Sequence, residues 1–260
     1  MFHTTEALVL REVRYKEADR ILTLFTAADG KITAKARGAL RKSSRTSAAT
    51  QQLTYAEMTL FGNRGKWTVN EASLLEPFAG LRADIERFAL GSYFAECMET
   101  FSVEDQPDAA LLQLGLNCLY ALSQGKIPTL QVKAAFELRL MELAGFAPDA
   151  GGCIVCGREE PEEPLFCLEN GALCCRNCRK ASLGATERLD GASLNALRYV
   201  LTAAPKRLLS FQLEGDGLTH LSRVAERYLL LKAERGFSTL DYWKKLHIPM
   251  TVTEREREIP

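Results

Sequence analysis

Residues 153–178 begin with Cys153-Ile154-Val155-Cys156-Gly157 and end with Cys175-Arg176-Asn177-Cys178, with eighteen residues between Cys156 and Cys175. Each Cys-x-x-Cys pair offers two thiolates from one tight turn, and two such pairs at this spacing are typical of a structural zinc site. Two disulfides or four idle thiols are the alternatives, and Cys174 could replace Cys175. Because a two-residue spacer matches the first pair, we predict one structural Zn²⁺ bound by Cys153, Cys156, Cys175 and Cys178.

The state of these thiols depends on the compartment in which the protein works. The N-terminus shows neither the charged nor the apolar region of a secretory signal, and no apolar run reaches the length of a membrane span. We therefore expect a cytoplasmic protein with no membrane partner, in which thiols stay reduced and zinc is favoured over disulfides. At 260 residues, 47% of them hydrophobic, the chain is long enough for two or three domains.

The net charge is zero, but its distribution along the chain is uneven. Residues 1–80 hold twelve Lys/Arg against eight Asp/Glu, a net charge of +4, whereas residues 81–150 hold five against ten, a net charge of −5. Between Asp29 and Glu71 the only acidic residue is Glu57. A positive field of this extent suits a polyanion. A solvated strand face and loop is the plainer alternative.

Residues 4–75 have the pattern of a small β-barrel. Alternation is strictest at 31–37, where Ile32, Ala34 and Ala36 point to one face and basic side chains to the other. The Asp-Gly pair before this run is a hairpin signal. Residues 39–52 are polar and basic without an apolar period, which predicts a mobile loop. Five short strands favour an OB-fold, with an SH3-like barrel as the alternative.

After Pro77 the apolar period changes from two to about 3.6, which is typical of helices. Helices are predicted at 82–101, 109–123, 128–144, 193–203 and 217–235, with Asp108 as an N-cap and Gly145 as a C′ glycine. The predicted fold class is multi-domain α+β. It comprises an N-terminal β-barrel (OB-fold) at 1–79, an α-helical domain at 80–150 and 183–248, an inserted four-Cys zinc module at 151–182, and a polar tail at 249–260.

The sequence has few features that are typical of an enzyme. A zinc ion held by four thiolates has no open position at which to activate water. The three histidines, His3, His220 and His247, do not occur in the His-x-Glu pattern of zinc deaminases. The phosphate-binding glycine loops and the Gly-x-Ser-x-Gly nucleophile motif are also absent from the sequence. We therefore expect no catalytic activity and no small-molecule substrate.

The barrel offers a binding surface instead. OB-folds bind single strands by joining a cationic track to aromatic stacking platforms. Trp67 could provide stacking, whereas Tyr55 and Phe61 fit the barrel core better. The predicted DNA-binding residues are Lys35, Arg37, Arg41, Lys42, Arg45, Arg64, Lys66 and Trp67.

Three signatures follow one another along the chain. The first is Tyr15-Lys16-Glu17-Ala18-Asp19, with Leu22-Thr23-Leu24-Phe25-Thr26 and Gly30. The second is Ala36-Arg37-Gly38-Ala39 with the serine-rich stretch behind it. The third is Phe136-Glu137-Leu138-Arg139-Leu140, Gly145-Phe146-Ala147-Pro148 and Cys153-x-x-Cys156-Gly157. Together with the order of barrel, helices, cysteine block and helices, they resemble RecO, a family of bacterial recombination mediators, over essentially the whole chain.

The resemblance implies a DNA-binding mediator of recombination in DNA repair. RecO proteins bind single- and double-stranded DNA, anneal complementary strands and, with RecR, help to load RecA onto DNA coated by single-strand binding protein (SSB). They also contact the C-terminal tail of SSB, and the resemblance places them at the nucleoid during repair. An acidic, Phe-ended tail needs an apolar pocket rimmed by cations. Arg139 and Lys133 on the third predicted helix are candidates for that rim.

Two rival readings stay open at this point. One is another zinc-containing OB-fold module that binds nucleic acid, associated with RNA or with transcription. The other is a protein–protein adaptor in which the basic stretch is only solvated surface. Acceleration of strand annealing separates the first rival from RecO, and salt-dependent DNA binding separates the second.

Overall fold

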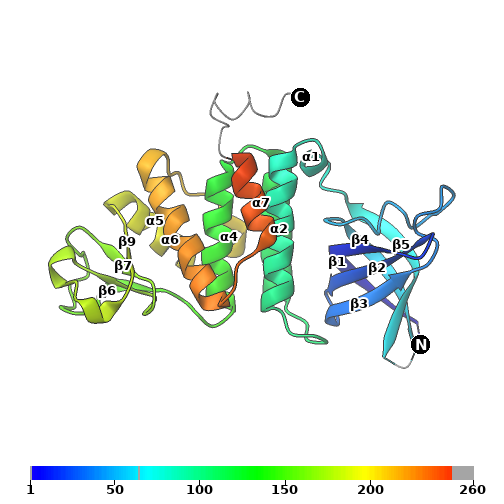
Figure 1. Ribbon diagram of the computed structural model, residues 1–260, viewed down its shortest axis with the longest axis horizontal. Coiled ribbons are helices and arrows are strands. Elements are labelled where there is room, and N and C mark those ends of the chain that lie inside the picture. The colour runs from blue at the N-terminus through cyan, green and yellow to red at the C-terminus, as the bar shows by residue number, and fades with distance from the viewer. Residues whose placement is uncertain (1, 64, 248–260) are drawn as a thin grey trace, which may run out of the picture.

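A computed structural model describes residues 2–63 and 65–247 of the chain. The molecule is elongated, with a β-barrel at one end, helices in the middle and a small β-sheet at the other end (Figure 1). The predicted fold class, an N-terminal barrel followed by helices with an inserted four-cysteine module, is confirmed. The predicted polar tail at 249–260 lies outside the described residues.

The barrel consists of β1 (Phe2–Tyr15), β2 (Asp19–Thr26), β3 (Gly30–Ala36), β4 (Tyr55–Asn63) and β5 (Lys66–Glu76). Its closed order is β1-β2-β3-β5-β4, in which β3 and β5 are parallel and the other neighbours antiparallel. This is the connectivity of an OB-fold and not of the SH3-like alternative. Ile32, Ala34 and Ala36 are buried inside the barrel, as their alternation predicts.

The helical region comprises α1 (Ala79–Arg82), α2 (Ile85–Phe101), α3 (Ala109–Gln124), α4 (Thr129–Leu143), α5 (Gly191–Thr202), α6 (Gly215–Ala233) and α7 (Ser238–His247). Asp108 caps α3 by accepting the N–H of Leu111 at 2.9 Å, and Gly145 follows α4 at φ +84°. The sequence patterns did not predict α7. Over 2–63 and 65–247, every helix is too short or too polar to cross a membrane.

The barrel and the helices share one apolar core. Leu8 and Leu10 of β1 and Phe25 of β2 point out of the barrel and are buried in the same cluster as the helices, with α2 packed on β1. The β2–β3 turn is part of this contact. A Cβ at Gly30, which has φ +69°, would lie 1.9 Å from the carbonyl oxygen of Gln106. The apolar core runs across residue 79, and the predicted domain boundary at this position stays a prediction.

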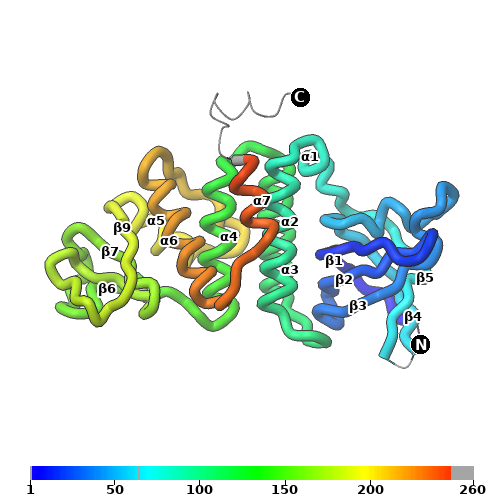
Figure 2. Tube along the Cα trace, viewed as in Figure 1, coloured from blue at the N-terminus to red at the C-terminus, as the bar shows by residue number. Residues whose placement is uncertain are grey.

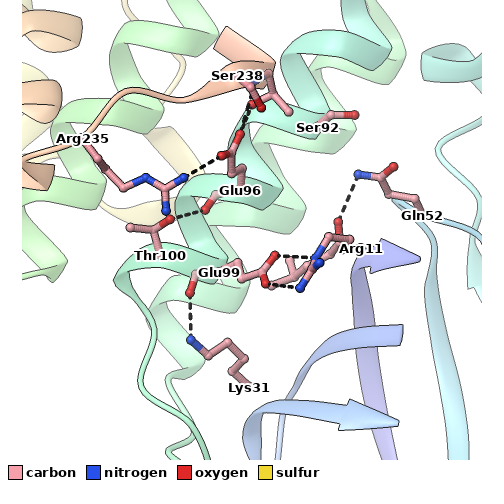
Figure 3. A pocket seen from close by; sticks show the side chains of 11 residues that line it. Arg11, Lys31, Gln52, Ser92, Glu96, Glu99, Thr100, Arg235 and Ser238 are labelled. Carbon is pink, nitrogen blue, oxygen red and sulfur yellow. Dashed lines mark hydrogen bonds and ion pairs between the residues drawn. The ribbon is translucent and has the colours of Figure 1, made fainter. Parts of the chain in front are cut away.

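Polar contacts line the same junction (Figure 3). Arg11 of β1 forms an ion pair with Glu99 of α2 at 2.8 Å. Lys31 of β3 donates to the carbonyl oxygens of Glu99 and Ser102 at 2.9 and 2.8 Å. These carbonyls lie at the C-terminal end of α2, where the helix dipole favours a cation. Lys31 therefore belongs to the junction, although its charge contributes to the basic run of the sequence.

A buried network of charges crosses the helical core. Lys133 of α4 is fully buried and lies 2.9 Å from carboxylate oxygens of both Glu137 and Glu226. Tyr93 of α2 donates to Glu137 at 2.8 Å, and Lys244 of α7 pairs with Glu226 of α6. Burial raises the pKa of Glu137 to about 7, although Lys133 opposes that shift. The network connects four helices that are distant in sequence.

Between α4 and α5 the chain forms β6 (Asp149–Cys153), β7 (Leu165–Cys167), β8 (Ala172–Cys174) and β9 (Thr186–Arg188) in the sheet order β6-β8-β7-β9. The β7–β8 hairpin matches the sequence pattern, whereas β6 and β9 were not predicted. The sheet docks on α6 through Phe166, whose ring lies edge-on to that of Tyr228 at 5.3 Å. A Cβ at Gly171 would lie 2.4 Å from the Tyr228 hydroxyl, so only glycine fits this contact.

Replacement of Lys133 by Met should destabilise the fold strongly. The carboxylates of Glu137 and Glu226 would stay buried without their shared cation, and breaking a buried pair in this way typically costs about 3–5 kcal/mol. Urea denaturation followed by circular dichroism measures the free energy of unfolding. Lys126→Met, at an exposed lysine between α3 and α4, is the matched control and should change it by less than about 0.5 kcal/mol. Equal stabilities for the two variants would contradict the role of the network.

Candidate metal centre and nucleic-acid interface

The four predicted metal ligands come together beside the small sheet. Cys153 ends β6, Cys175 follows β8, and Cys178 ends the 3-10 helix η1 (Arg176–Cys178). The sulfur atoms of these three and of Cys156 all lie within 4.8 Å of one another, and those of Cys156 and Cys175 are 3.9 Å apart. A tetrahedral ion with bonds of about 2.3 Å needs sulfurs about 3.8 Å apart. The cluster is therefore close enough to bind one metal ion.

Backbone hydrogen bonds build both Cys-x-x-Cys turns. Gly157, at φ +74°, donates its N–H to the carbonyl of Cys153 at 2.8 Å, and Cys178 donates to Cys175 at 3.0 Å. The sulfur of Cys153 accepts the N–H of Cys175 at 3.3 Å. Burial raises the pKa of the Cys153 thiol, but backbone N–H donors, that of Cys156 foremost, bring the pKa down to about 6. Cys153 is thus prepared to bind a cation as a thiolate.

Cys175 and its neighbour Cys174 have different surroundings. Cys174 faces Cys167 across the β7–β8 hairpin, with the two sulfurs 3.3 Å apart and both side chains buried. Cys174 does not belong to the four-sulfur cluster, so the structure favours the register with Cys175. All eight cysteines are free thiols, and the disulfide alternative is not formed. Four thiolates would fill every corner of a tetrahedron and leave no position for water.

The acidic segment inside the cysteine module is neutralised by arginines. Three exposed ion pairs are present: Arg158 with Glu162, Arg176 with Glu163, and Arg198 of α5 with Glu160. Exposed pairs of this kind contribute little to stability. They do give the module a mixed surface charge. The exposed cations predicted to bind DNA lie elsewhere, on the barrel.

The loop between β3 and β4, residues 37–54, is called the basic loop below. It consists of turns and has neither helix nor strand, in agreement with the sequence pattern. Its backbone is nevertheless anchored to the barrel. Asp19 accepts the N–H of Gly38 at 2.8 Å, and Arg20 donates to the carbonyl of Ser47 and the hydroxyl of Thr50, both at 2.8 Å. Two small side chains of the loop also pack into the barrel core.

Four of the predicted DNA-binding side chains lie on the basic loop: Arg37, Arg41, Lys42 and Arg45. All four are exposed. Within 2–63 and 65–247, none of them is paired with a carboxylate, in contrast to Lys35 and Arg20 nearby. Unpaired cations on an anchored backbone are suited to contact phosphates. Their contact with DNA stays a prediction.

Lys35 has a different environment from the loop cations. Its ammonium lies 2.8 Å from Asp19 and 4.9 Å from the centre of the Tyr15 ring. The hydrogen bond from Lys35, followed by that from the N–H of Gly38, lowers the pKa of Asp19. Lys35 is thus held in one place on the outer face of β3, beside the first residues of the basic loop.

Lys66 and Trp67 begin β5, and Trp67 is paired with Ala34 of the parallel strand β3. Both side chains line a pocket with His3 and with Asp29, which lies in the β2–β3 turn before β3, whereas the basic loop follows β3. Lys66 is exposed. Trp67 is half-buried against the barrel core and lies over Gly62, where a Cβ would come within 2.8 Å of its ring. Arg64 lies outside the described residues. The structure therefore separates the predicted interface into a large cluster on the loop and a small one near Lys66.

The two aromatic residues expected in the barrel core differ. Tyr55 is half-buried and donates its hydroxyl to Glu6. Phe61 is 38% exposed, and its ring lies 5.1 Å from that of Phe2 outside the barrel. The expectation of a barrel-core position is thus wrong for both, since Tyr55 packs outside the barrel against the cluster shared with the helices. The place of Phe61 follows from alternation, since Leu60 and Met58 take the inward positions of β4.

The two cations suggested for the rim of an apolar pocket are both used inside the fold. Lys133 is buried in the charge network of the helical core. Arg139 pairs with Glu142 at 3.1 Å and donates to the carbonyls of Val200 and Ala203, at the end of α5. The suggestion is therefore wrong for both residues. A lysine with a glutamate four positions later has the same sequence pattern whether the pair is solvated or buried.

Sequence reasoning assigned no role to Asp19 and Arg20, although they anchor the basic loop. Only weak features of the sequence point to this anchoring role. Asp19 lies in the N-terminal signature, and Arg20 is a charged residue directly before the apolar run of β2. Only the structure shows that Arg20 is buried, where it also pairs with Glu12 at 3.2 Å.

Comparison with protein families gives two adjoining matches. The family model "Recombination protein O N terminal" matches residues 1–78, and "Recombination protein O C terminal" matches residues 82–241. The first covers the barrel, and the second covers the helices together with the cysteine module.

Similar proteins match over nearly the whole chain. The "DNA repair protein RecO" of Acetivibrio thermocellus is 36% identical over 242 residues, which is 93% of this chain and 96% of that relative. The protein of the same name from Heliobacterium modesticaldum is 34% identical over 252 residues, covering 92% and 89%. That from Alkaliphilus metalliredigens is 29% identical over 247 residues, covering 95% and 100%.

Single Cys→Ser variants test the ligand set. Cys175→Ser should lose tightly bound metal, because three thiolates leave the tetrahedron open, whereas Cys174→Ser should keep one ion per chain. Metal content after gel filtration, measured by plasma mass spectrometry, gives the result. Cys174 is the matched control, since it is the adjacent buried cysteine. Full metal retention by Cys175→Ser would overturn the assignment.

Proposed function

We propose that this chain, which belongs to the RecO family of DNA repair proteins, binds single- and double-stranded DNA through its barrel. The observation that carries the proposal is the basic loop, which presents exposed cations without carboxylate partners in the described ranges on a backbone anchored by Asp19 and Arg20. Phosphate contacts of this kind are sequence-tolerant and sensitive to salt. The proposed interface consists of Lys35, Arg37, Arg41, Lys42, Arg45, Arg64, Lys66 and Trp67.

The same charges support annealing of complementary strands. Two strands repel each other through their phosphates, and a cationic surface that neutralises both lowers this barrier to pairing. Base pairing then selects the partner strand, so the protein does not need to read the sequence. No covalent bond forms or breaks in this process. We therefore assign no catalytic residue.

Family membership supports the remaining parts of the proposal. With RecR, the chain helps to load RecA onto SSB-coated DNA, and it binds the C-terminal tail of SSB. It works in the cytoplasm, at the nucleoid during repair. The cations that bind the tail are other than Lys133 and Arg139, because both of these side chains bind partners inside the helical region.

We assign the four-cysteine cluster to one structural Zn²⁺. The apolar cluster of the module is small and consists largely of cysteine side chains, so its own packing contributes little. An ion bound by Cys153, Cys156, Cys175 and Cys178 would hold β6, β8 and η1 together. The ion would be closed to water, which makes its role architectural.

Reversal of Arg37, Arg41 and Lys42 to Glu should abolish DNA binding at moderate salt. Three phosphate contacts are lost and three repulsive ones are added, whereas the exposed positions leave the barrel core intact. Fluorescence anisotropy of labelled single strands and duplexes at two salt concentrations measures the affinity.

A matched control reverses three exposed cations far from the loop, Lys126, Lys206 and Arg207. It carries the same change in net charge and should bind within about threefold of the parent, because most of the affinity comes from close contacts. Thermal unfolding shows that both variants are folded. Unchanged affinity of the loop variant at low salt would contradict the proposed interface.

The parent protein should accelerate the annealing of complementary strands coated with SSB, and the loop variant should not. Energy transfer between dyes on the two strands follows the reaction in real time. Rising salt should slow the reaction, since it screens the cations. DNA binding without any acceleration would favour the rival reading, a different OB-fold nucleic-acid module.

A further inference from the structure

The outer face of strands β1, β2 and β3 carries exposed apolar side chains next to the basic loop. Leu22, Leu24 and Ala34 fill the barrel core, so the alternate positions of the same strands point outward. Two cross-strand rows result: Val13, Ile21 and Lys35 form one, and Arg11, Thr23 and Thr33 form the other. Tyr15 is paired with Asp19 at the end of this face.

Tyr15 is the aromatic residue of this face. It is 43% exposed, and Val13, two positions earlier on the same side of β1, is 48% exposed. Lys16 and Lys35 place their ammonium groups 5.6 and 4.9 Å from the centre of its ring. An exposed ring with two cations over it combines the aromatic face and the positive charges of a stacking platform for a nucleobase and its phosphates.

The backbone keeps Tyr15 in place at the edge of the basic loop. Lys16 adopts φ +53°, an uncommon conformation for a residue with a side chain. The next residues are tied to the loop, because Leu40 donates its N–H to the carbonyl of Ala18 at 2.9 Å and Gly38 donates to Asp19 at 2.8 Å. The ring therefore lies beside the first loop residues, whose arginines are exposed.

Two of the acidic side chains on this side of the barrel are already engaged, whereas Glu17, in the β1–β2 turn, is exposed. Asp19 is bound to Lys35 and Gly38, and Glu99 is bound to Arg11. Lys16 and Arg37 add further positive charge, so the electrostatic field around the ring is mainly positive. An anionic strand is favoured there over a cationic or a neutral apolar partner.

We propose that Tyr15 stacks on an unpaired base of single-stranded DNA, while Lys16 and Lys35 contact the phosphates on either side of that base. The inference rests on the proposed function and deepens it, because it gives the interface a part that distinguishes single strands from duplexes. Bases in a duplex are stacked on one another and do not offer a free face to the ring. The loop cations contact both forms of DNA through their phosphates.

Tyr15→Ala should weaken binding to a single-stranded oligonucleotide about tenfold, within the range of base–aromatic stacking. Binding to a duplex of the same length should change less than twofold. The dependence of affinity on salt should stay as in the parent, because the substitution removes no charge. Tyr15→Phe, which keeps the ring, should bind like the parent.

Tyr120→Ala is the matched control, since Tyr120 is a 53% exposed tyrosine on α3. It should bind both forms of DNA like the parent, and thermal unfolding shows whether all variants keep the fold. A Tyr15→Ala protein that binds single strands within twofold of the parent overturns this inference alone. Equal losses for single strands and duplexes also overturn it, because the ring would then only position Lys35. A parent that binds neither form of DNA overturns the proposed function together with the inference.

Discussion

Asp19 and Arg20 are consecutive residues at the start of β2, and their side chains leave opposite faces of the strand. Asp19 holds the beginning of the basic loop at Gly38, whereas Arg20 holds its middle at Ser47 and Thr50. The loop has no helix or strand of its own, and its cations repel one another. Its defined shape, and with it the arrangement of the basic surface, therefore depends on these two anchors. Figure 2 shows the course of the loop's backbone between β3 and β4.

Local signals with a single physical meaning could be predicted from the sequence. The alternation at 31–37 identified a strand with a buried face, and Asp108 identified the start of α3. The cysteine spacing identified the four sulfurs that cluster, and a matching spacer selected Cys175 over Cys174. Each of these inferences uses residues close in sequence, where geometry leaves few alternatives.

Features that depend on distant parts of the chain could not be predicted in this way. From the sequence, Lys133 was interpreted as a surface cation, because its partner Glu226 lies ninety-three positions later on another helix. The strands β6 and β9 are too short for a period and gain their hydrogen bonds only from the sheet. α7 is only ten residues long, and its apolar side chains Leu240 and Trp243 become buried only by packing on distant parts of the chain such as α2. Tyr15 became a candidate only when the register placed Lys35 beside it.

The apolar core shared by the barrel and the helices has a consequence for any assembly that this chain joins. Bending the barrel away from α2 would expose Leu8, Leu10 and Phe25 and withdraw Lys31 from the end of that helix. A ligand bound to the barrel and a second one bound to the far sheet would thus be held at a fixed distance and angle to each other, as they would not be if a flexible linker joined the two parts. The orientation of the first would then restrict the directions from which the second can approach, without any contact between them.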